Sequence, residues 1–167
     1  MSVLARLARN TLGGGGRLRR WFPAPVLARI EQAVAAGETG HIGEVCFAVE
    51  AQLPLALVLR GVTSRQRAEK AFGELRVWDT ERNTGVLVYL LLSERKVEIV
   101  ADRGIAAHVG QDEWERICSA LAAHCASDQP ESGVLEAIGA IHALLERHFP
   151  SLGQANPNER PDAPVLL

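Results

Sequence analysis

Apolar side chains recur with two distinct periods along the chain, and the period separates helices from strands. Four segments place an apolar residue every three or four positions and therefore predict helices, at 25–37, 64–77, 111–126 and 130–149. Pro25 and Pro130 suit a first helical turn, where the missing N–H would have no partner anyway. Ser64 is expected to cap the second helix, because its hydroxyl can accept a bond from a free backbone N–H.

Three shorter apolar runs predict strands, at 44–50, 84–92 and 97–101. The run 84–92 is apolar on both faces, which is typical of a strand at the centre of a sheet covered by helices. Only residues 93–96 separate it from the next strand, so the pair must be antiparallel. The run 53–59 contains Pro54, which indicates an edge piece or a packed loop. The pattern predicts a layered α/β domain with a mixed sheet between helices.

Glycine and proline divide the chain into three parts. Four consecutive glycines, 13–16, are expected to break regular structure and to separate a basic flexible arm, residues 1–21, from the domain. The folded unit is expected over residues 22–150. Residues 151–167 are rich in Pro, Asn and charge, which predicts a disordered C-terminal tail.

Composition favours a soluble globular protein, since 47% of the 167 residues are hydrophobic and 23% are charged. The three cysteines lie in apolar runs and are expected to stay reduced. The longest uncharged apolar run, 85–92, is too short to span a bilayer. No secretory signal pattern is evident, so we expect a cytoplasmic protein, and the Ala, Arg and Leu usage resembles that of bacteria.

Charge is distributed unevenly. Residues 1–30 contain six arginines and no acid, whereas the rest of the chain carries twelve basic and twenty acidic side chains. A basic arm on an acidic body could make weak contact with an anionic membrane surface, or it could be a solvated extension. Aromatic residues are too sparse for a nucleic-acid platform, and no nucleic-acid partner is expected.

Polar clusters flank the strands, and one of them suggests a metal site. An antiparallel return from 84–92 to 97–101 brings residues 79–83 and 102–103 to the same end of the sheet. Asp79, Glu81 and Asp102 could then converge, and oxygen-rich groups of this kind suit Ca²⁺ or Mg²⁺. The alternative is that these acids are solvated or paired with neighbouring arginines.

A histidine is the other candidate for chemistry. His41 precedes the first strand, is expected to be exposed and could act as an acid or base. The sequence contains no paired-cysteine zinc pattern, no nucleophile motif and no phosphate loop.

Short motifs around the predicted strand pair resemble the TPM domain family, named for its thylakoid, photosystem II and receptor-modulator founders. The matching segments are 83–87 (NTGVL), 94–97 (ERKV), 98–100 (EIV) and 104–105 (GI). The resemblance covers about residues 23–149 and implies a three-layer α/β/α sandwich whose mixed sheet contains an antiparallel pair. Some relatives are associated with Ca²⁺ and weak acid phosphatase activity, and others with assembly or repair. Asp102, Arg103 and Ala106 depart from the family's usual residues.

The resemblance and the missing nucleophile together lead us to expect a non-enzymatic binding, assembly or repair factor. Its partner would be an unknown protein, held by the charged loops at one end of the sheet. The alternative is a weak divalent-metal-dependent acid phosphatase, that is, a phosphomonoester hydrolase. Candidate ligand-binding residues are Asn83, Arg95, Arg103 and His41, with Arg95 or Arg103 suited to phosphate by guanidinium geometry.

Overall fold

A four-stranded sheet forms the middle layer of the computed structural model, which describes residues 3–12, 14–153 and 159–167. The strand order is β3-β2-β1-β4. β1 is parallel to β2 and β4, and β2 is antiparallel to β3, as expected for this pair. The elements are α1 (Val3–Leu12), α2 (Gly14–Trp21), α3 (Ala24–Glu38), β1 (Glu44–Glu50), α4 (Leu55–Leu59), α5 (Ser64–Glu74), β2 (Gly85–Leu91), β3 (Lys96–Ala101), α6 (Arg103–Ala106), α7 (Gln111–Ala126), α8 (Pro130–His148) and β4 (Val165–Leu166).

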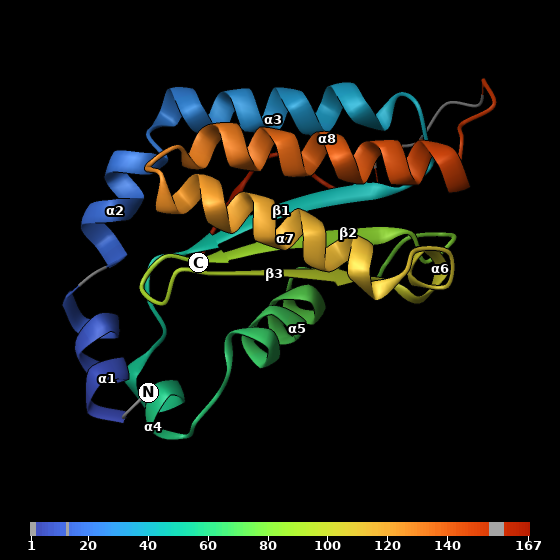
Figure 1. The fold of residues 1–167 in the computed structure, drawn as a ribbon. Helices are drawn as coiled ribbons and strands as arrows, with labels where there is room; N and C mark the ends of the chain where they lie inside the picture. Colours follow the sequence, from blue (N-terminus) through green and yellow to red (C-terminus); the bar gives the residue numbers. More distant parts are fainter. Residues whose placement is uncertain (1–2, 13, 154–158) are drawn as a thin grey trace.

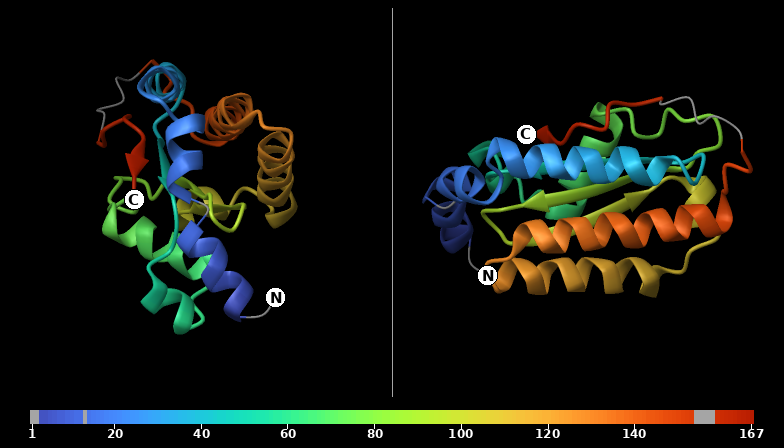
Figure 2. Two further views of the ribbon diagram at one scale, coloured as in Figure 1. Left: turned by 90° about the vertical axis from the view of Figure 1, so that its left-hand side faces the viewer. Right: turned by 90° about the horizontal axis from the view of Figure 1, so that it is seen from above.

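Helices cover both faces of the sheet, which confirms the predicted α/β/α sandwich (Figures 1 and 2). One core lies between the sheet and α3, α7 and α8, and it takes alternate strand residues such as Phe47 and Val88. The other core lies on the α5 side and takes the intervening residues, such as Ala48 and Tyr89. Because side chains alternate across a strand, every residue of β1 and β2 is buried.

Two short segments differ from the sequence-based expectation. Residues 55–59 form the small helix α4, because Pro54 sits at its N-cap, where a missing N–H costs nothing. Thr63, and not Ser64, caps α5: its hydroxyl accepts from Gln66 N, and the Gln66 side chain accepts from Thr63 N. The Ser64 hydroxyl instead donates to Glu98, 2.5 Å away, and links α5 to β3.

The expected glycine break and the expected tail also have regular structure in the described residues. α2 begins at Gly14, which is buried against the backbone of Ala51, the first residue after β1. A Cβ on residue 14 would lie 2.0 Å from Ala51 O. Glycine is therefore selected here by a close approach. Near the other terminus, Val165 and Leu166 add a parallel strand to β1 (Figure 2). The expectations for residues 13 and 154–158 lie outside the described residues.

Helix α1 of the N-terminal arm packs against the domain and is held there by buried hydrogen bonds of Asn10. Asn10, only 1% exposed, accepts from Leu53 N (2.8 Å) and from the Ser93 hydroxyl (2.7 Å). Its amide donates to Glu94 (2.9 Å), which also pairs with Arg6 at 2.7 Å. These bonds tie α1 to the segment after β1 and to the β2–β3 turn. No helix in the described residues is long and apolar enough to cross a membrane.

Candidate functional site at the charged rim

Two loops meet where β2 begins and β3 ends, and we call residues 78–83 and 102–107 the charged rim. Asp102 N donates to Gly85 O (2.9 Å), and Gly104 N donates to Asn83 O (2.9 Å). A Cβ on Gly104 would lie 2.4 Å from Arg82 O, so the two loops can approach only because residue 104 is glycine. Asn83 has a φ of +57°, a left-handed conformation that asparagine tolerates well. The two loops are therefore held in one arrangement.

The three predicted metal ligands do lie in the rim, but two of their carboxylates have local partners and the third is exposed. Asp79 pairs with Arg76 at 2.7 Å. The carboxylate of Glu81 is exposed, and its backbone N–H points to Glu159 at 3.3 Å. Asp102 caps α6 by accepting from Arg103 N at 2.7 Å.

The residues present do not fit a carboxylate-held metal ion. Within residues 3–12, 14–153 and 159–167, no group of three Asp, Glu, His or Cys side chains could hold one. One atom departs from this pattern: Asp102 Oδ2 is buried and has no hydrogen-bond partner among the described residues. Binding of Ca²⁺ or Mg²⁺ thus stays a prediction that the arrangement of these side chains does not support.

His41 is not exposed, contrary to expectation. Its side chain is fully buried, with Nε2 2.7 Å from His142 Nδ1. His41 Nδ1 accepts from Gly43 N (3.1 Å), so Nε2 must carry the proton and donate to His142. Burial, and then the neighbouring His142, lower the pKa of His41 to about 4. The pair is a neutral packing element between α8 and the start of β1, and its partner lies too far along the chain to be read from sequence.

The remaining candidates lie at opposite ends of the sheet. Arg103 is exposed in the rim beside Asn83, whereas Arg95 lies in the β2–β3 turn. β2 has seven residues, which separates the two ends by roughly 20 Å. Arg95 and Arg103 therefore cannot hold one phosphate group together.

A buried polar network on the α5 side was not predicted. Glu50, at the end of β1, accepts from the Tyr89 hydroxyl (2.6 Å) and pairs with Arg67 Nε (2.8 Å). Burial, and then Glu50, raise the pKa of Tyr89. The one sequence signal was a glutamate directly after the apolar run of β1, where a buried charge requires a partner.

Comparisons with known proteins agree with this architecture. A family model described as TPM domain matches residues 22–144. The chain is similar in structure to the BA42 protein from the psychrophilic bacterium Bizionia argentinensis, with 22% identity, a TM-score of 0.75, and coverage of 86% of this chain and 94% of that one. It is also similar to the N-terminal domain of a P. gingivalis protein, with 17% identity, a TM-score of 0.62, and coverage of 87% of this chain and 88% of that one. No curated protein matches the sequence. At these identities the two structural likenesses concern the fold.

Proposed function

Because the chain belongs to the TPM domain family, we propose that it is a binding protein whose charged rim holds a protein partner. The observation that carries this proposal is Trp78, a large apolar side chain that is 48% exposed within the rim. Tryptophan and arginine are the residues most enriched among those that dominate binding energy at protein interfaces. The rim offers both kinds of side chain on a single pair of loops.

The charged rim also carries arginines that could bind a partner's acidic groups. Arg82 and Arg103 are exposed, and neither makes an ion pair with any described residue. Asp79 is held by Arg76, which leaves these two arginines available to acidic groups of a partner. Arginine suits this role because its planar fork can bind a carboxylate through two hydrogen bonds.

The two loops of the charged rim are already ordered in the free protein, which favours binding. The bonds from Asp102 N and Gly104 N and the bond from Thr84 N to Thr80 Oγ1 (2.9 Å) hold both loops before any partner arrives. A surface already in its bound arrangement loses less conformational entropy on association.

The test is quantitative affinity capture from a lysate of the source organism, using the immobilised full chain. Trp78→Ala/Arg103→Ala removes the anchor and one arginine of the rim. Leu59→Ala/Arg60→Ala is the matched control, since it also removes one exposed apolar side chain and one exposed arginine, but at α4. We expect a protein retained by wild type and control to be lost, by at least tenfold, on the rim variant. Equal retention by both variants would contradict the proposal.

A metal-dependent acid phosphatase is the second candidate, and Asp102 Oδ2 is the observation that favours it. This buried oxygen lacks a partner among the described residues, and a cation would satisfy it. If the candidate is correct, millimolar Ca²⁺ or Mg²⁺ raises the unfolding temperature of wild type and not of Asp102→Asn. Hydrolysis of p-nitrophenyl phosphate at acid pH would have to be lost with the same substitution. If the metal ions do not shift the unfolding temperature and no hydrolysis is detected, this second candidate is rejected and only the binding function remains.

A further inference from the structure

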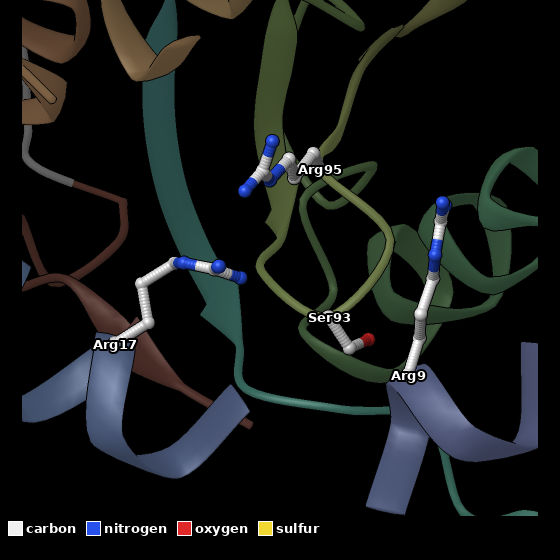
Figure 3. Close-up of a pocket in the computed structure, with 4 residues that line it drawn as sticks. All are labelled: Arg9, Arg17, Ser93 and Arg95. Carbon is white, nitrogen blue, oxygen red and sulfur yellow. The ribbon is translucent and has the colours of Figure 1, made fainter. Parts of the chain in front are cut away.

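A pocket of about 260 Å³ lies at the end of the sheet opposite the charged rim, and arginines dominate its lining. Arg9 comes from α1, Arg17 from α2, and Ser93 and Arg95 from the β2–β3 turn. Figure 3 shows Arg17 and Arg95 extending toward one another, Ser93 at the base, and Arg9 rising from α1 on the other side of the turn. Because β1 and β2 are parallel, this end carries the carboxyl ends of both strands, where open α/β sheets bind their ligands.

The docked arm completes this pocket. Asn10 and Arg6 bind the turn through Ser93 and Glu94, and so they fix α1 beside it. Arg17 Nη1 donates to Leu92 O (2.9 Å), the first residue after β2, which fixes α2. The family match begins at residue 22, so two of the three arginines belong to a part of the chain outside the matched domain.

The three arginines retain free hydrogen-bonding capacity. None of them makes an ion pair within the described residues, although Glu94 lies in the same turn as Arg95. Glu94 is instead engaged by Arg6 and Asn10. Arg17 is stacked over Trp21, 5.4 Å from the ring centroid, and uses one of its five N–H donors on Leu92. The pocket therefore concentrates positive charge that the protein itself does not neutralise.

We propose that this pocket binds a phosphate-bearing anion, a small phosphomonoester or a pyrophosphate group. Guanidinium groups bind phosphate through paired charge-assisted hydrogen bonds, and Arg17 and Arg95, which extend toward one another, together match a dianion in charge. The volume is below the 300–1,000 Å³ usual for drug-sized ligands, which favours a compact anionic group. This site is separate from the rim and does not depend on the function proposed there.

Calorimetric titration of inorganic pyrophosphate into the full chain tests the proposal. Arg17→Gln/Arg95→Gln removes two pocket arginines, and Arg19→Gln/Lys96→Gln removes the same charge from exposed neighbours outside the pocket lining. We expect roughly hundredfold weaker binding for the pocket variant and at most a twofold change for the control. The single substitution Arg95→Gln separates binding from folding, because the Arg95 side chain is exposed and makes no ion pair with the described residues. It should leave the unfolding temperature unchanged and still weaken binding about tenfold.

Vesicles identify the source of the phosphate group. Co-sedimentation with phosphatidic acid vesicles, and not with phosphatidylcholine vesicles, would assign the site to a lipid headgroup if pyrophosphate competes and the pocket variant no longer sediments. Pyrophosphate binding without sedimentation would assign it to a soluble phosphate ester. The proposal is overturned if neither probe binds, or if the pocket and control variants bind equally well.

Discussion

Docking of the N-terminal arm rests on Asn10, and Asn10→Ala tests this dependence directly. The substitution removes the acceptor for two donors, Leu53 N and the Ser93 hydroxyl, and both donors are buried. It also removes the amide that donates to Glu94. A buried donor that loses its partner costs about 1–3 kcal/mol, so the two donors together predict a loss of about 2–6 kcal/mol in the free energy of docking.

Chemical denaturation and limited trypsin digestion measure this loss. Each 1.4 kcal/mol raises the detached fraction of the arm tenfold, so cleavage at the arm's arginines should accelerate by more than tenfold. Thr11→Ala is the control, because among the described residues the Thr11 hydroxyl bonds only to carbonyls of its own helix, at Leu7 and Ala8. Cleavage and stability in Asn10→Ala that equal those of Thr11→Ala would refute the docking argument. The same variant should also weaken pyrophosphate binding, since the arm positions Arg9.

Three further perturbations test the interior. Gly37→Ala should destabilise the fold by about 1–3 kcal/mol in denaturant, because the new Cβ would lie 2.1 Å from the His142 ring, a clash that exceeds the gain in helix propensity. Arg67→Met should cost about 3–5 kcal/mol in the same assay, since it leaves the Glu50 carboxylate buried without its cation. Wild type should lose stability as the pH rises, and Glu38→Gln should lose less. Burial raises the pKa of Glu38 to about 8 from 4.5, so the folded state holds this proton more tightly and loses that stability as the pH rises toward 8. Between pH 6.5 and pH 8 the wild type should lose about 2 kcal/mol more than the variant.

Each of these perturbations has a control elsewhere in the chain. Gly139→Ala, in open space on α8, should stabilise by up to about 1 kcal/mol. Tyr89→Phe leaves the Glu50–Arg67 pair intact and should cost about 1–2 kcal/mol, less than Arg67→Met. Glu31→Gln, exposed on α3, should not alter the pH dependence. The clash argument is contradicted if Gly37→Ala is as stable as wild type. The ion-pair argument is contradicted if Arg67→Met loses no more stability than Tyr89→Phe. The burial argument for Glu38 is contradicted if the stability of Glu38→Gln and of wild type changes with pH in parallel.

The parts of the fold that follow from local pattern could be predicted from the sequence. β1 and α7 begin and end where the apolar periodicity does, and the short turn at 93–96 sufficed to make β2 and β3 antiparallel. Such features depend on neighbours a few residues apart. The strand boundaries also show which polar loops lie at each end of the sheet.

Features decided by distant contacts could not be predicted in this way. Gly14 is required by the close approach of the arm to Ala51 and starts a helix, whereas glycine composition alone suggested a break. His41 is buried by a partner 101 residues away. Asp79 and Asp102 reached the predicted end of the sheet, but Arg76 and a helix cap engage them there. The arginine pocket requires three segments to meet, and its only trace in the sequence is the excess of arginine before residue 30.

Partner binding at the charged rim is the central claim, and hydrogen–deuterium exchange of the purified complex tests it most directly. The complex would be formed from the full chain and the protein captured by wild type but not by Trp78→Ala/Arg103→Ala. We expect slower exchange in residues 78–83 and 102–107, and unchanged exchange at the Arg95 turn. Protection confined to other surfaces, or no captured protein to test, would contradict the claim.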